Sequence, residues 1–93
     1  MKNGDVVTLV TMMGEVIGRL KEETPHGYVV ESPRLFVPDP NNGANGGLAP
    51  GVSMTGVQEP KESQFNRGVV LTITPTHPDI EKAWVSATSG IIL

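Results

Sequence analysis

The residues from Asp5 to Glu31 constrain the fold more than any other part of this chain, because they hold three apolar strand patterns and two turn signals. Val6–Thr11 is rich in valine, leucine and threonine, which favour strands. Met13-Gly14 then marks a tight turn, and 15–21 alternates between two faces. Pro25 and Gly27 bracket the second turn. The stretch therefore predicts a three-stranded antiparallel meander.

Details within these strands predict how the sheet is shaped. The first strand is apolar on both faces, as expected for a strand that is covered on both sides. Gly18 lies inside the second strand, where a glycine indicates a bulge or a bend. The third strand is expected over Gly27–Val37 and contains Pro33, which cannot donate a ladder hydrogen bond. At Pro33 the strand is expected to lie at an edge, to be bulged, or to be broken in two.

The remainder of the chain predicts a loop, two more strands and a helix. Residues 38–50 are rich in proline, asparagine and glycine and predict a long flexible loop. Fourth and fifth strands are expected over Gly51–Val57 and Phe65–Thr74. A helix is expected over about 78–89. Its apolar residues at helical spacing, with Trp84 as the core or interface anchor, are Ile80, Ala83, Trp84 and Ala87. The fold class is mainly β: a small, strongly bent five-stranded antiparallel barrel with one C-terminal helix.

Composition limits the class of protein. A chain of 93 residues, of which 38% are hydrophobic and 18% charged, is expected to form a single domain over residues 1–93. It contains no cysteine, no apolar run near the length of a membrane span and no signal-peptide pattern, so we expect a cytoplasmic protein without a membrane partner. The net charge of −3 has the wrong sign for binding nucleic acid mainly through charge, so any such site must be local.

No residue pattern points to catalysis. The paired acids Glu22 and Glu23 have no partner at a spacing that suggests acid-base chemistry, and no Ser-His-Asp or Cys-His set can be nominated. The glycines of NNGANGG lack the lysine of a phosphate-binding loop. His26 and His77 lie far apart without an acid-rich cluster, which makes a zinc site improbable. We therefore predict a protein that is not an enzyme and has no metal, cofactor or evident small-molecule substrate.

The segments GDVVTLVTMMGEVIGRL and KAWVSATSGI resemble the Sm/LSm family of RNA-binding ring proteins, and more narrowly the small Sm-like proteins of marine cyanophages. The resemblance implies a strongly bent five-stranded sheet that forms closed rings, in which the fourth strand of one subunit pairs with the fifth strand of the next. The family's uridine pocket contains an aspartate, a stacking aromatic residue and an asparagine. Thr24, His26 and Tyr28 stand at those positions here.

The second family motif is an arginine-glycine pair in the turn between the fourth and fifth strands, and Arg67-Gly68 is similar to it. The strand pattern instead places this pair at the start of the fifth strand, and the register stays open. The candidate nucleic-acid-binding residues are His26, Tyr28, Asn66 and Arg67. Tyr28 is either a core or interface aromatic residue or a base-stacking one, and Arg67 either contacts a base or phosphate or is a turn arginine.

Two functions follow as hypotheses. The first is a homo-oligomeric Sm-like ring that binds RNA or single-stranded DNA and acts in RNA or DNA processing, in the host cytoplasm if the protein is of phage origin. The second is a structural or assembly component of a phage particle, which the acidic charge and the missing aspartate and asparagine favour. The sequence does not fix the ring size.

Overall fold

The computed structural model describes residues 1–38 and 46–89. The predicted meander is confirmed as β1 (Val6–Thr11), β2 (Gly14–Thr24) and β3 (Gly27–Pro38), each antiparallel to the next. Three further strands follow: β4 (Gly46–Leu48), β5 (Glu62–Asn66) and β6 (Val70–Pro75). A 3₁₀ turn, η1 (Arg67–Val69), separates β5 from β6, and α1 (Pro78–Thr88) is the C-terminal helix. The predicted mainly β fold with one C-terminal helix is thus confirmed.

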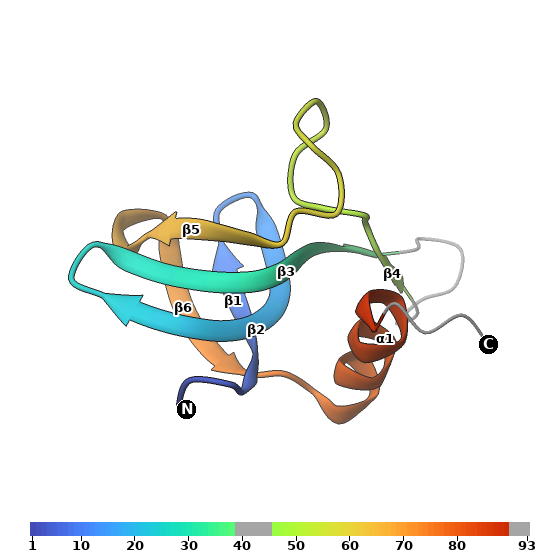
Figure 1. The fold of residues 1–93 in the computed structure, drawn as a ribbon, viewed down its shortest axis with the longest axis horizontal. Coiled ribbons are helices and arrows are strands. Elements are labelled where there is room, and N and C mark those ends of the chain that lie inside the picture. Colours follow the sequence, from blue (N-terminus) through green and yellow to red (C-terminus); the bar gives the residue numbers. More distant parts are fainter. Residues whose placement is uncertain (39–45, 90–93) are drawn as a thin grey trace.

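The six described strands form one antiparallel sheet in the order β4-β3-β2-β1-β6, and β5 also pairs with β3 (Figure 1). The long strand β3 has two partners on the same side, since 27–31 pairs with β5 and 36–38 pairs with β4. No pairing joins β5 to β6 in the described ranges. Over the described residues the sheet is therefore open, with β4 and β5 at one edge and β6 at the other, and the expected barrel is not closed.

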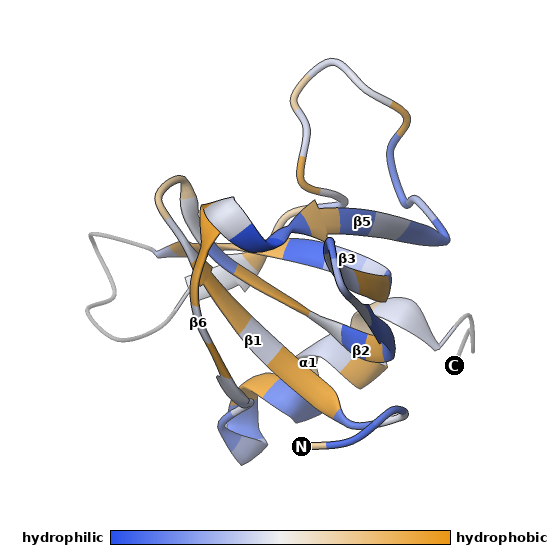
Figure 2. Cartoon of the chain, turned by 90° about the vertical axis from the view of Figure 1, so that its left-hand side faces the viewer, coloured by the Kyte–Doolittle hydropathy of each residue, from blue (hydrophilic) through white to orange (hydrophobic). Residues whose placement is uncertain are grey.

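The sheet has apolar side chains on both faces, as the pattern of the first strand predicts. One cluster of buried residues lies on one face and consists of Val7, Leu9, Val16, Leu20 and Val30. The other face carries a smaller cluster formed by Val6, Ile17 and Trp84. Figure 2 shows β1, between β2 and β6, as mainly hydrophobic along its length. Successive strand residues point to opposite faces, so neighbouring apolar residues such as Val6 and Val7 enter different clusters.

The expected bulges lie where Gly18 and Pro33 predict them. Between Ile17 and Arg19 the register shifts, because Ser32 and Pro33 of β3 lie opposite the single residue Gly18. Ser32 has a φ of 49°, which is a left-handed conformation. A Cβ at position 18 would collide with the Val30 side chain and approach the Glu31 carbonyl oxygen to 2.9 Å. The irregular pairing therefore requires a glycine at this position.

The prediction of a fourth strand over Gly51–Val57 is wrong. This segment belongs to the long loop between β4 and β5, which projects away from the sheet (Figure 1). Met54 and Val57 are 98% and 85% exposed, because no neighbouring strand is present to cover them. The strand that follows β4 is instead β5, at Glu62–Asn66.

Two other predicted boundaries need correction. The expected loop over 38–50 contains the three-residue strand β4, which pairs with the end of β3, and its residues 39–45 lie outside the described ranges. The expected fifth strand over Phe65–Thr74 is interrupted at η1 by the 3₁₀ turn. The sheet thus has six strands where five were expected.

The helix α1 begins within the predicted range and packs by a narrow face. Trp84 is buried, Ile80 is partly buried, and Ala83 and Ala87 are exposed, although all four were expected on one packed stripe. The Trp84 indole Nε1 donates to the Ser32 carbonyl at 2.9 Å. This hydrogen bond and the burial of the ring confirm Trp84 as the anchor of the helix.

Candidate nucleic-acid interface

Two turns meet at one end of the sheet. The first joins β2 to β3 and the second is η1, and they are held together because Gly27 pairs with Asn66 and the Arg67 amide donates to the His26 carbonyl at 2.9 Å. A Cβ at position 27 would overlap the Phe65 carbonyl. Glycine at position 27 therefore allows β5 to approach the turn closely enough to bring Arg67 beside it.

Thr24 shapes the first turn from inside. Its hydroxyl oxygen accepts hydrogen bonds from the His26 and Gly27 amides at 3.2 and 3.1 Å, and the hydroxyl donates to the Gly27 carbonyl at 3.4 Å. A threonine that bonds the backbone two and three residues later is a common turn device. Thr24 thus stabilises the turn, and its hydroxyl is already engaged in hydrogen bonds.

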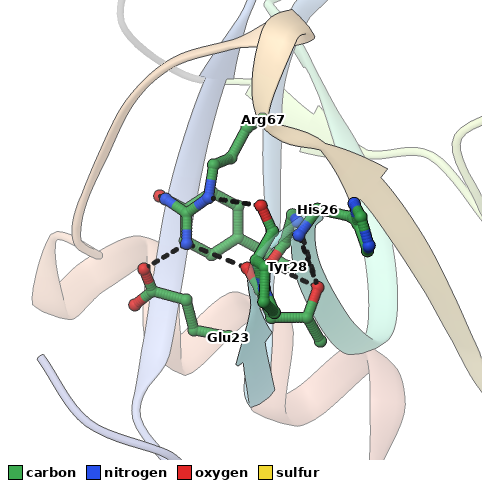
Figure 3. A network of polar contacts seen from close by, with 7 residues as sticks. Glu23, His26, Tyr28 and Arg67 are labelled. Carbon is green, nitrogen blue, oxygen red and sulfur yellow. Dashed lines mark hydrogen bonds and ion pairs between the residues drawn. The ribbon is translucent and has the colours of Figure 1, made fainter.

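The Arg67 side chain, at the second turn, donates hydrogen bonds to the first turn (Figure 3). Its Nε donates to the Pro25 carbonyl at 3.3 Å and its Nη2 donates to the Thr24 carbonyl at 2.9 Å. Nη2 also donates to Glu23 Oε2 at 2.6 Å, and Nη1 donates to the Tyr28 hydroxyl at 3.3 Å. The guanidinium carbon lies 5.1 Å from the centroid of the Tyr28 ring, in cation–π geometry.

The charge of this arginine is matched by a carboxylate. The hydrogen bond from Arg67 to Glu23 is the largest cause that raises the pKa of Arg67 above its usual value, so the guanidinium remains protonated. The two side chains are 45% and 54% exposed. Because the pair is neutral as a unit, the cluster offers little net positive charge to an approaching phosphate.

The structure brings the predicted site residues together around this pair. Tyr28 is half-buried under the Arg67 guanidinium, and the register of Arg67 is resolved by η1, which places it in the turn between β5 and β6. Asn66 is exposed at the end of β5, and its side chain makes no hydrogen bond to the described residues. His26 is exposed, as expected, and its ring points away from Arg67 (Figure 3).

Glu23 is the functional candidate that the sequence did not reveal. Its partner lies 44 positions later in the chain, so no local spacing indicates the contact. The strand register gives a signal once the meander is accepted, because Glu23 lies opposite Tyr28 in the β2–β3 pair. Because Glu23 lies beside Tyr28 on the sheet, it also lies beside the Arg67 guanidinium that stacks on the Tyr28 ring.

Comparison with known proteins gives no match, either to a protein family or to a curated protein sequence. Over residues 1–38 and 46–89, no helix has the length and apolar character to cross a membrane. Within the same ranges, no three histidine, cysteine, aspartate or glutamate residues gather in a group that could hold a metal ion.

Proposed function

We propose that this chain is an Sm-like subunit that assembles into a homo-oligomeric ring and binds RNA or single-stranded DNA at the turn cluster formed by His26, Tyr28, Asn66 and Arg67. The observation that carries the proposal is the meeting of two turns from distant parts of the chain, which gathers an exposed imidazole, a phenol ring and a guanidinium. Flat rings of this kind stack on unpaired bases of any sequence.

The edges of the sheet support the assembly. Apart from the three-residue β4, the described sheet has five longer strands in the spatial order β5-β3-β2-β1-β6. Along the chain, the fourth and fifth of these longer strands are β5 and β6, and they lie at the two edges. These are the strands that the resemblance pairs between neighbouring subunits. Leu71 is 67% exposed at a bulge in β6, and Val69 just before β6 is 48% exposed. An open edge with apolar side chains favours pairing with another chain.

The charges decide how such a ring would bind. Arg67 is paired with Glu23, and the chain carries a net charge of −3. Each subunit would therefore bind weakly and mainly by stacking, and the circle of identical sites would supply the affinity. Because few phosphates are neutralised in this mode, the affinity should fall only gently as salt increases.

Assembly and binding are tested separately. Mass measurement in solution at tens of micromolar should find a closed oligomer, and Leu71→Lys should shift it toward monomer, since this exposed side chain can change without disturbing the core. A strict monomer of the unaltered protein would contradict the ring.

Binding is measured by fluorescence anisotropy with labelled oligo-uridine and oligo-adenine. His26→Ala should weaken binding, whereas His77→Asn is a matched control that removes the other imidazole while keeping an acceptor for the Asp79 amide. If no single strand binds even at low salt, the binding half of the proposal fails. Arg67→Ala is a poor first test, because it also removes the contacts that hold the turns.

A structural or assembly component of a phage particle is the second candidate, and one observation favours it: Arg19 and Arg67 are engaged within the protein, and the third arginine, Arg34, is buried. Arg19 donates to the Gly4 carbonyl at 2.7 Å and lies 5.3 Å from the Trp84 ring centroid. Arg34 is buried near Glu59, and Arg67 is paired with Glu23. A closed oligomer that binds neither RNA nor single-stranded DNA would support this candidate over the first.

A further inference from the structure

The guanidinium of Arg67 has little capacity left for a ligand. Arginine carries five N–H donors, and four are directed at Pro25, Thr24, Glu23 and Tyr28. One N–H on Nη1 remains without a partner among the described residues. A phosphate bound in the usual bidentate way needs two donors on neighbouring nitrogens, so it must displace one of the present acceptors.

The four acceptors differ in how readily each can give up its hydrogen bond to Arg67. Two are backbone carbonyls of the β2–β3 turn, and releasing them would loosen that turn. The Tyr28 hydroxyl belongs to a half-buried ring that packs against the core cluster. The Glu23 carboxylate is on an exposed side chain, and its contact is nevertheless the shortest, at 2.6 Å. Glu23 can rotate into solvent without disturbing the backbone.

We infer that Glu23 acts as an internal competitor for Arg67, which keeps phosphate off the guanidinium and directs the site toward the faces of bases. This inference rests on the proposed nucleic-acid binding and adds a residue that sets the specificity of the same site. The carboxylate holds a donor on Nη2, the nitrogen next to Nη1, so it competes for one of the two nitrogens that a bidentate phosphate would bind there. Its negative charge also repels a phosphate that approaches without displacing it.

Glu23→Gln is the direct test, because the amide keeps an oxygen acceptor of the same shape for Nη2 and removes the charge. Glu22→Gln is the matched control: it changes the net charge equally, lies on the adjacent residue of β2 and makes no contact with Arg67. The probe is fluorescently labelled oligo-uridine, titrated over a range of salt concentrations.

Glu23→Gln should bind the strand more tightly by about 3- to 5-fold per site, the effect of removing one unit charge at roughly 5 Å in water. The plot of log affinity against log salt should steepen by about 0.7 for each additional phosphate that the variant neutralises on a single strand. Glu22→Gln should leave that slope unchanged. A second readout follows the Arg67 Nε–H resonance by NMR during titration with inorganic phosphate, and it should move more in Glu23→Gln than in the unaltered protein.

The outcomes separate this inference from the function on which it rests. Equal slopes and equal affinities for the two variants would overturn the role of Glu23, even when the unaltered protein binds. Binding by Glu23→Gln alone would show that Glu23 keeps the strand off Arg67, and it would contradict the proposed binding by the unaltered protein. If neither the unaltered protein nor Glu23→Gln binds, the proposed function and the inference both fail.

Discussion

Replacing Trp84 tests whether one side chain holds the helix to the sheet. Trp84 is 4% exposed, and it packs with Val6 and Ile17 while its Nε1 donates to the Ser32 carbonyl. Truncating a buried tryptophan to alanine typically costs about 3–5 kcal/mol. A chain of this length has a total stability of about 5–14 kcal/mol, so Trp84→Ala should remove a large part of it. Trp84→Phe keeps most of the apolar contact and loses the hydrogen bond, which should cost about 1–2 kcal/mol.

The assay is urea unfolding followed by circular dichroism, because Trp84 is the only tryptophan and its fluorescence disappears with it. Val85→Ala is the matched control: it lies on the same helix, is 42% exposed, and should change stability by no more than about 0.5 kcal/mol. An unfolding midpoint of Trp84→Ala that equals the midpoint of Val85→Ala would refute the assigned role of the indole.

Three further predictions concern the bulge, the turn cluster and a surface pair. Gly18→Ala should lower the free energy of unfolding by about 2 kcal/mol or more, because the added methyl group overpacks against Val30. Gly47→Ala is the control, since a Cβ there meets open space, and it should leave the melting temperature in a thermal unfolding experiment nearly unchanged. Arg67→Ala should speed amide exchange at Gly27, measured by NMR, while Lys61→Ala leaves that rate unchanged. Glu62 raises the pKa of Lys21, so the stabilising effect of their pair should be present at neutral pH and be lost in alkali as pH rises through the raised pKa. The difference in unfolding midpoint between the unaltered protein and Glu62→Gln should shrink accordingly, and a constant difference would contradict the sign.

The strands that the sequence predicts correctly are those whose signal is local. Apolar alternation and turn residues within 5–31 define the meander, and the bulge follows from the residues Gly18 and Pro33 themselves. The predicted fourth strand fails because apolar residues such as Met54 and Val57 do not form a strand without a neighbour to pair with. The sequence ESQFN, with a single phenylalanine, forms β5 because β3 offers it a partner. That pairing is a tertiary contact, which local propensity does not reveal.

For the candidate site too, the local features could be predicted from the sequence and the long-range contacts could not. The residue types at positions 26, 28, 66 and 67 could be selected from the sequence through the resemblance, and the structure gathers them around two adjoining turns. The internal partners could not be selected, because Glu23 and Arg67 are 44 positions apart and meet only through the β3–β5 register. Electrostatic pairing across a sheet depends on that register, and the composition records only the total charge.

The engaged side chains also limit how well the cluster could distinguish one base from another. Base identity is read through hydrogen bonds to base edges, while stacking accepts every base. The hydroxyls of Thr24 and Tyr28 and most donors of Arg67 are already bonded within the protein. Within the described residues, the polar groups of the cluster that remain without partners are the ring nitrogens of His26, the amide of Asn66, one Nη1 donor of Arg67 and the hydroxyl proton of Tyr28. These groups provide few discriminating contacts, so a ring built from this subunit should bind oligo-uridine and oligo-adenine with similar affinity, and any preference should become smaller in Asn66→Ala.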